Sequence, residues 1–130
     1  MTAEPRWLSK DLVLAIHDEQ LVVFGGGTGL RDDGLLESAL ARPMNLLAYE
    51  PETKLARLAA SLAWGLIRNH PFVDGNKRTG DLAIRAFLRL TGQNFEPDQA
   101  EEVAVIISVA AGEMEEDELA AWIEANSHPI

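Results

Sequence analysis

The sequence predicts an all-α fold, a single-domain bundle of about six helices over residues 1–130, and three observations support this class. Six separate segments carry apolar residues at helical spacing, and none shows the strict alternation of a half-buried strand. Residues that favour helix caps stand directly before several of these segments. The chain has 130 residues, of which 47% are hydrophobic, so it is long enough to bury a core.

The first helix is predicted to begin after Ser9, which can cap it, and to run to Phe24. Gly25 ends this helix and opens a glycine-rich loop at residues 25–29. The loop lacks the Gly-Lys-Ser/Thr ending of a phosphate-binding P-loop and does not follow a strand. We therefore interpret it as a helix end and a turn.

The later helices are expected at about residues 33–42, 54–69, 77–91, 99–111 and 116–125. Asp32 or Asp33 caps the second helix, which is expected to be short and to end before Pro43, because proline disrupts helix interiors. Thr53 is expected to cap the third helix. Asp98 stands three residues before Glu101 at the start of the fifth helix, which is the spacing of a capping box.

Charge is divided unevenly along the chain. Residues 1–91 hold all 11 Lys and Arg and 11 of the 21 acids, so they are neutral, and residues 92–130 hold the other acids, which gives the net charge of −10. An acidic surface repels a phosphate backbone, so direct nucleic-acid binding is not expected. The acidic part is either a solvated surface or a docking surface for a basic partner, and we favour the first. We also expect residues 96–118 to lie outside any active site.

Several functional classes are disfavoured by composition. The chain has no cysteine, so it forms no disulfides and no thiolate metal site. Three histidines without a recognised ligand spacing do not predict a zinc site, and we interpret His17 and His128 as surface or core-edge residues. No apolar run approaches the ~20 residues of a membrane helix, and residues 1–9 are polar. We therefore expect no signal peptide, no membrane partner and a cytoplasmic location.

The most informative stretch is residues 70–78, His-Pro-Phe-Val-Asp-Gly-Asn-Lys-Arg, which joins two predicted helices. It leads into a helix N-terminus, where unpaired N–H groups and the helix dipole attract anions. Lys77 and Arg78 oppose that dipole unless a phosphate is bound beside them. Asp74 is a hard oxygen ligand of the kind that Mg²⁺ prefers, and His70 is suited to act as a base.

Each of these residues also has a structural interpretation. Asp74 and Gly75 are typical of a turn, Asn76 can cap the next helix, and Phe72 can anchor the loop in the core. In its functional role the Asn76 amide would hold a phosphate or fix the loop. His70 alone is typical of a helix C-terminus, where a cation suits the dipole. These interpretations explain the residues one at a time, whereas a phosphate site explains them together.

The stretch 70–78 resembles the signature of the Fic superfamily, and Lys77 is the residue that its death-on-curing (Doc) toxins carry where other Fic proteins have glycine. Residues 29–40 and the opening Trp7-Leu8-Ser9 also resemble that family, so the resemblance extends to about residue 95. It implies the fold of a Fic/Doc-like helical bundle.

The resemblance implies a Doc-like protein kinase, the toxin of a type II toxin–antitoxin system. Such an enzyme transfers the γ-phosphate of ATP, with Mg²⁺, to a threonine hydroxyl of elongation factor Tu and arrests translation. The implied site consists of His70 for catalysis, Asp74 for metal binding, and Arg68, Gly75, Asn76, Lys77 and Arg78 for nucleotide and phosphate binding.

A cognate antitoxin with a disordered C-terminal segment is also implied, because the chain has no inhibitory Ser/Thr-x-x-x-Glu-Gly/Asn motif of its own. Residues 46–53 are expected to form a flap that aligns the target chain. Asp81 stands where adenylylating Fic enzymes have a second arginine. Two alternatives therefore stay open, a protein adenylyltransferase and a non-catalytic interaction protein on the Fic scaffold.

Overall fold

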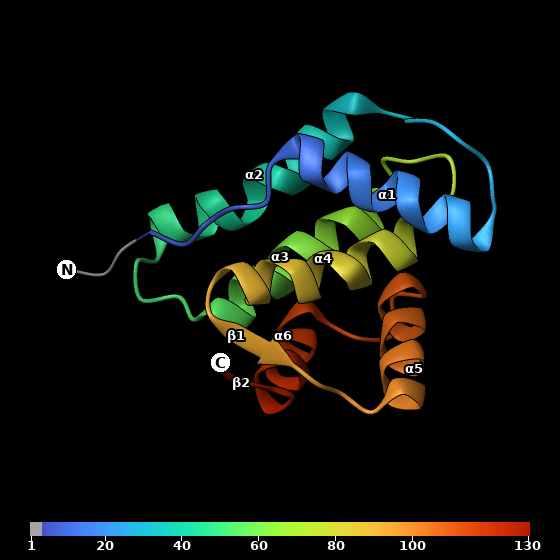
Figure 1. The fold of residues 1–130 in the computed structure, drawn as a ribbon. Helices are drawn as coiled ribbons and strands as arrows, with labels where there is room; N and C mark the ends of the chain where they lie inside the picture. The colour runs from blue at the N-terminus through green and yellow to red at the C-terminus, as the bar shows by residue number, and fades with distance from the viewer. Residues whose placement is uncertain (1–3) are drawn as a thin grey trace.

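The computed structural model of the chain describes residues 4–130. The described part consists of six helices and two short strands (Figure 1). In chain order these are α1 (Lys10–Phe24), α2 (Asp33–Tyr49), α3 (Leu55–Arg68), α4 (Asn76–Leu90), β1 (Gln93–Phe95), α5 (Gln99–Ala110), α6 (Glu116–Ala125) and β2 (Ser127–Pro129). The all-α prediction is confirmed, with the addition of a small sheet.

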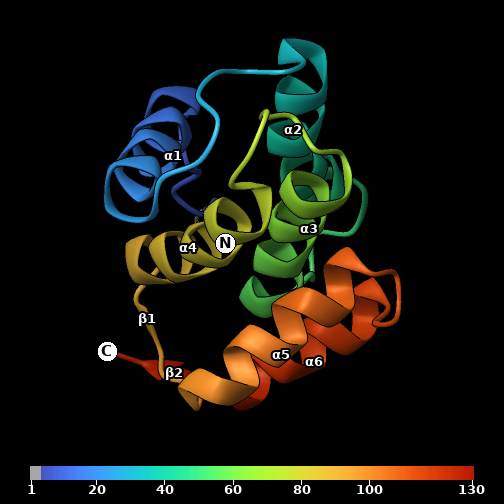
Figure 2. The same cartoon turned by 90° about the vertical axis from the view of Figure 1, so that its right-hand side faces the viewer.

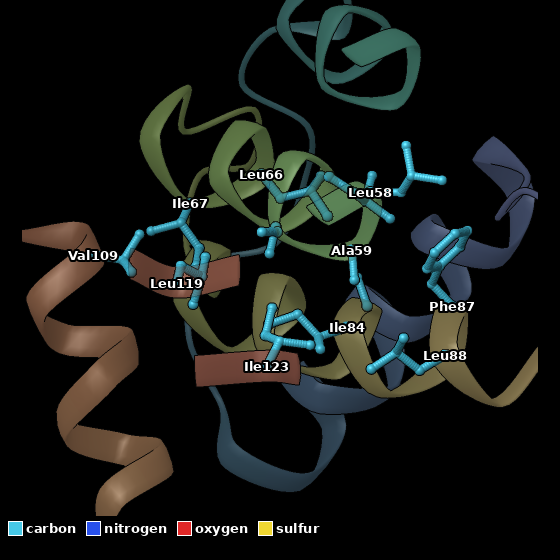
Figure 3. Close-up of a cluster of buried hydrophobic side chains, with 14 of the residues drawn as sticks. Leu58, Ala59, Leu66, Ile67, Ile84, Phe87, Leu88, Val109, Leu119 and Ile123 are labelled. Atoms are coloured by element: carbon cyan, nitrogen blue, oxygen red, sulfur yellow. The ribbon is translucent and has the colours of Figure 1, made fainter. Parts of the chain in front are cut away.

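Helix α3 is the centre of the packing. It contacts α2, α4, α5 and α6, and α1 packs on α4. The pair α3–α4 lies between α1 and α2 on one side and α5 and α6 on the other (Figures 1 and 2). Side chains from α3, α4, α5 and α6 meet in the buried cluster of Figure 3. Among the described residues, no helix combines the length and the apolar composition that crossing a membrane requires.

Two glycines allow α3 to lie close to its neighbours. A Cβ atom at Gly65 would lie 2.9 Å from the Cα of Ala39 in α2. A Cβ atom at Gly80 in α4 would lie 2.5 Å from Cγ1 of Ile67 in α3. The interior is close-packed, so neither position has room for a larger residue without separating the helices. This close contact fixes the ends of α3 and α4 that the loop 69–75 connects.

The expected end of the second helix is wrong, because α2 continues through Pro43 to Tyr49. A proline inside a helix costs about 3 kcal/mol, since it removes one hydrogen bond and its ring crowds the preceding turn. Here Pro43 is buried, and Leu46 and Leu47 beyond it pack on the core. Fully burying a leucine contributes about 1.5–3 kcal/mol, so two half-buried leucines together with the buried Pro43 offset the local cost.

Strands β1 and β2 were not expected from the sequence; they pair antiparallel, with Gln93 opposite Pro129 and Phe95 opposite Ser127. Each strand has three residues, which is too short to show an alternating pattern. Their partners are more than 30 residues apart in the sequence, so only the packing of α6 brings them together.

Most helix caps follow the prediction. Ser9 Oγ accepts from the backbone N–H of Leu12 at 3.1 Å, and Asp98 accepts from that of Glu101 at 3.0 Å. The third helix begins one residue later than expected, after Lys54, because the Thr53 hydroxyl donates backwards to the Glu50 carbonyl.

The acidic C-terminal part pairs with the basic residues of the N-terminal part. Glu116 of α6 contacts both Arg42 of α2 and Arg57 of α3. Glu102 of α5 binds Arg85 of α4 at 2.9 Å. The expectation of a merely solvated acidic surface is therefore wrong for these residues. Their charges hold α5 and α6 against the other helices.

Candidate functional site

The loop 69–75 connects the C-terminus of α3 to the N-terminus of α4. Asn69 ends α3, and Gly75 precedes α4 with φ of 79°, a left-handed conformation that glycine adopts without strain. A Cβ atom at Gly75 would lie 2.0 Å from Nε2 of the buried Gln20. Glycine is therefore needed here both for its backbone angle and for its small size.

The side-chain amide of Asn76 closes this loop. Asn76 is buried, its Oδ1 accepts from the backbone N–H of Phe72 at 3.0 Å, and its Nδ2 donates to the Phe72 carbonyl at 3.0 Å. Nδ2 also lies 3.4 Å from Nδ1 of His70, a long contact that does not fix which ring nitrogen carries the proton. The predicted N-cap role of Asn76 is wrong, because Gly75 precedes the helix, whereas the predicted role of its amide in fixing the loop is confirmed.

The exposed His70 has a left-handed backbone, with φ of 50°. This conformation costs a non-glycine residue about 1–3 kcal/mol and persists only where the surroundings impose it. Arg31 supplies that constraint, because its Nε donates to the His70 carbonyl at 2.6 Å and its Nη2 to the Asn69 carbonyl at 2.8 Å. The backbone N–H groups of Arg31 and Asp32 both donate to the Pro71 carbonyl.

Helix α1 supports the loop from the other side. The His17 ring stacks on Phe72 with 3.8 Å between centroids, and its Nε2 is 2.8 Å from the Asp74 carbonyl. His17 is 2% exposed, so its interpretation as a surface or core-edge residue is wrong. A signal for this was present, since Val13, His17 and Gln20 are spaced to share one helix face.

The glycine-rich loop has a further role beyond ending α1. The N–H of Gly27 donates to Oδ2 of Asp74 at 3.3 Å, and the Gly29 carbonyl accepts from the N–H of Val73 at 3.1 Å. A Cβ atom at Gly26 would lie 2.7 Å from Oδ2 of Asp74. The glycines therefore let this loop lie directly against the motif.

A cavity of about 600 Å³ lies between the motif and α5. One wall consists of motif and α4 residues, namely His70, Val73, Asp74, Gly75, Asn76, Lys77, Arg78 and Asp81. The other wall is apolar and consists of Val103, Ile106 and Ile107 of α5. The expectation that residues 96–118 lie outside the site is therefore wrong for α5, although its contribution is apolar and not acidic.

The first turn of α4 brings positive charge to this cavity. Lys77 and Arg78 are exposed there, and the Arg78 guanidinium lies 3.6 Å from the centre of the Phe24 ring. Gly75 has no side chain with which to cap the helix. The first N–H groups of α4 are thus left for a ligand, and an anion is the ligand that they and the two cations favour.

Asp74 is the candidate metal ligand. Its Oδ1 accepts from the N–H of Gly75 at 2.8 Å, and both oxygens retain lone pairs at the exposed edge of the cavity. In residues 4–130 no group of three or more acidic or histidine side chains is arranged to hold a metal ion. A single carboxylate suits Mg²⁺ that is bound mainly through phosphates and water.

Two predicted elements lie away from the cavity. Arg68 donates from Nη1 to the carbonyl of Ala110 at 3.1 Å, at the C-terminus of α5, and it is not among the cavity residues. Residues 46–53 precede α3, whereas His70 follows it, and 14 helical residues span about 21 Å. The expected flap therefore lies at the opposite end of α3 from the motif.

Asp81 has an unusual environment on the motif wall. Burial first, and then the hydrogen bond with Glu102 and the negative charge of Glu102, raise the pKa of its carboxyl to about 8 against the opposing charge of Arg85. The acid at this position is therefore neutral over most of the physiological range. This removes the repulsion that a charged Asp81 would exert on a phosphate ligand.

Comparisons of the sequence with known proteins find a family and two relatives. The family model described as "Fic/DOC family" matches residues 7–88. The chain is 38% identical over 105 residues to the protein named Toxin Doc of Mycolicibacterium smegmatis, which covers 77% of this chain and 79% of the relative. It is 34% identical over 110 residues to Protein kinase doc of Escherichia phage P1, which covers 84% of this chain and 86% of the relative.

We predict that substitutions of His17 separate its two contacts with the loop. His17→Phe keeps a ring against Phe72 and loses the hydrogen bond to Asp74, so it should lower the free energy of unfolding by about 0.5–1.5 kcal/mol. His17→Ala also loses the stacked ring and should cost about 2–5 kcal/mol. Urea denaturation measures both, and equal losses would show that the ring contributes no packing.

Proposed function

We propose a function for this chain on the basis of its family, since it belongs to the Fic/DOC family. The protein is a Doc-type toxin and a protein kinase that transfers the γ-phosphate of ATP to a threonine hydroxyl of elongation factor Tu. The observation that carries the proposal is one cavity that holds an exposed histidine, a carboxylate and two cations at an uncapped helix N-terminus. The names of the two relatives, a toxin and a protein kinase, support both parts.

In the proposed reaction the threonine oxygen forms a bond to the γ-phosphorus as the bond from that phosphorus to the β,γ-bridging oxygen breaks. His70 accepts the hydroxyl proton, and ADP leaves with the electron pair of the broken bond. Lys77, Arg78 and the first N–H groups of α4 bind the phosphate oxygens and stabilise the charge that develops there. Asp74 would hold Mg²⁺, which neutralises phosphate charge when bound.

The residues around the motif are suited to hold these groups still. The Asn76 amide and the Arg31 guanidinium fix the loop backbone on both sides of His70. A base that is already held in the reactive position accepts a proton without a further free-energy cost of reorganisation, which favours phosphoryl transfer. The apolar wall of α5 would limit the water that reaches the phosphates.

Protein adenylylation is the alternative within enzymes, because the same cavity would accept ATP in the reverse orientation. Lys77 in place of glycine and Asp81 in place of arginine favour phosphorylation. Incubation with bacterial lysate and ATP labelled at the γ position distinguishes the two, since only phosphorylation transfers the label. A mass gain of one adenylyl group on the target would overturn the kinase assignment.

A non-catalytic interaction protein is the second alternative. It keeps the fold and lacks turnover, and Asp81 in the cavity is the feature that favours it. A change of melting temperature on addition of ATP and Mg²⁺, followed by transfer to a lysate protein, would exclude it.

The first prediction for the reaction concerns His70. His70→Ala should reduce transfer of labelled phosphate by at least about 10²-fold, because general-base catalysis contributes about 10²–10⁴-fold. The circular dichroism spectrum and the melting temperature should stay near those of the wild type, since the exposed ring makes few contacts. Near-normal transfer by the variant would eliminate His70 as the base.

A second prediction compares two exposed cations of α4. Lys77→Ala removes a charge at the N-terminus that lines the cavity, whereas Arg89→Ala removes one near the C-terminus of the same helix. Loss of a charge-assisted contact costs about 1.5–3 kcal/mol, so Lys77→Ala should weaken ATP binding or turnover by roughly tenfold to a hundredfold. Equal effects of the two variants would contradict a phosphate site at Lys77.

We also propose a cognate antitoxin that covers the motif with an amphipathic helix. Large apolar side chains are exposed at the end of α1, with Val22 at 86%, Val23 at 67% and Phe24 at 59%, and Phe24 lies against Arg78 of the motif. Val73 on the motif loop is 57% exposed. A helix laid on these residues would bury them and block access to His70. A disordered segment that folds on binding is suited to such a surface.

We therefore expect Val23→Asp to separate toxicity from neutralisation. The variant should still arrest bacterial growth, and the co-expressed antitoxin should bind it roughly tenfold more weakly or worse, as calorimetry would measure. Tyr49→Asp, at a residue of α2 that is 85% exposed, is the control and should bind the antitoxin normally. Unchanged affinity of Val23→Asp would place the antitoxin elsewhere.

A further inference from the structure

Asp81 presents a buried polar atom that the proposed reaction leaves unexplained. It lies in the second turn of α4, and it lines the cavity with Lys77 and Arg78. Its Oδ1 is buried and has no hydrogen-bond partner among the described residues. A buried polar atom without a partner costs about 1–3 kcal/mol, so the site calls for an explanation.

The neighbour of Asp81 is a second carboxyl group, that of Glu102 in the first turn of α5. Glu102 is buried, and Nη2 of Arg85 donates to both of its oxygens, at 3.0 and 2.9 Å. Nη1 of Arg85 donates to the Phe95 carbonyl at 2.7 Å. Glu102 is therefore the ionised member that Arg85 stabilises, and these Arg85 donors are not directed at Asp81.

Two carboxyl groups in contact cannot both ionise without strong repulsion, so such a pair holds a proton that bridges it. A protonated Asp81 donates to Glu102 from one carboxyl oxygen, and the other, Oδ1, then stays in a neutral acid, which costs less to bury without a partner than a carboxylate oxygen does. Burial of Asp81, the first cause of its raised pKa, acts in the same direction as this contact.

We propose that Asp81 and Glu102 share one proton at neutral pH, and that this proton determines the affinity of the cavity for an anionic ligand. With the proton present, the charges at the cavity are the cations of Lys77, Arg78 and the helix terminus, opposed by Asp74. Without it, a further negative charge appears on the same wall as Lys77 and Arg78. The ligand in question is the nucleoside triphosphate, so this part rests on the proposed function.

The charged groups that surround Asp81 come from three parts of the chain. Its own helix presents Lys77, Arg78 and Arg85, α5 presents Glu102, and the loop presents His70 and Asp74. Within residues 4–130, neither α1, α3 nor β1 contributes a charged side chain to the lining of this cavity. A loss of ligand affinity between pH 7.5 and 9 that is absent in Asp81→Asn is therefore assigned to the pair.

The same proton also makes a defined contribution to stability. The pKa of Asp81 is raised in the folded protein, from 3.8 to about 8, so between these values the folded state binds a proton that the unfolded state does not. Stability from this group is fully present below pH 3.8, falls as pH rises towards 8, and does not change beyond. Asp81→Asn, which cannot ionise, should lack this decline.

The first test needs no ligand. In uniformly ¹³C-labelled protein, the side-chain carboxyl resonance of Asp81, identified by its absence from the Asp81→Asn spectrum, should titrate with a midpoint near pH 8. A midpoint near pH 4 would overturn the proposal. The unfolding free energy, followed by urea denaturation from pH 4 to 9, should decline more in the wild type than in Asp81→Asn.

The second test uses ATP as the probe, with calorimetry at pH 7.5 and 9. The wild type should bind roughly tenfold more weakly at the higher pH, whereas Asp81→Asn should bind equally at both. Asp11→Asn, which removes an exposed carboxylate from α1, is the control and should behave as the wild type. A pH-independent affinity in the wild type would overturn the link between the pair and the ligand.

The two tests separate this inference from the proposed function. A protein that binds no ATP at any pH contradicts the nucleotide function and the link to ligand affinity. The carboxyl titration would still decide whether the shared proton exists, because it is measured on the protein alone.

Discussion

The buried amide of Asn76 is the contact on which the arrangement of the site depends. It satisfies both backbone groups of Phe72, and so it folds the chain back between α3 and α4 within a few residues. Only an amide carries a donor and an acceptor at this spacing, so neither aspartate nor leucine would replace it. With the turn closed in this way, Phe72 reaches the core and His70 is left at the surface. The burial of Phe72 and the exposure of His70 are therefore both results of the hydrogen bonds made by Asn76.

Much of the fold followed from local signals in the sequence. The cap at Ser9 and the bounds of α6 are local features, and they agree with the structure. The continuation of α2 through Pro43 and the two strands were not predicted, because each depends on contacts with residues far along the chain. Helix propensity is a local property, so it does not include the packing of Leu46 and Leu47 that offsets the cost of Pro43.

The candidate site shows the same division. His70 and residues 74–78 are adjacent in the sequence, and the structure brings them to one cavity. Arg31 and His17 were not singled out, because each acts on the loop through a backbone carbonyl and leaves no pattern beside the motif. The wall from α5 was missed for a related reason. Its apolar residues look like ordinary core positions until the position of α5 relative to α4 is known.

The fastening of α5 has a mechanical consequence for the cavity. Near its start, Glu102 is bound by Arg85, and at its end the Ala110 carbonyl is bound by Arg68. Because α5 is bound near both ends, it resists rotating away from α4 about either end. The distance between α5 and α4 is thus held constant, and a ligand too large for this cavity is excluded by steric clash with α5. Selection by shape at this cavity then depends on two arginines, neither of which needs to touch the ligand.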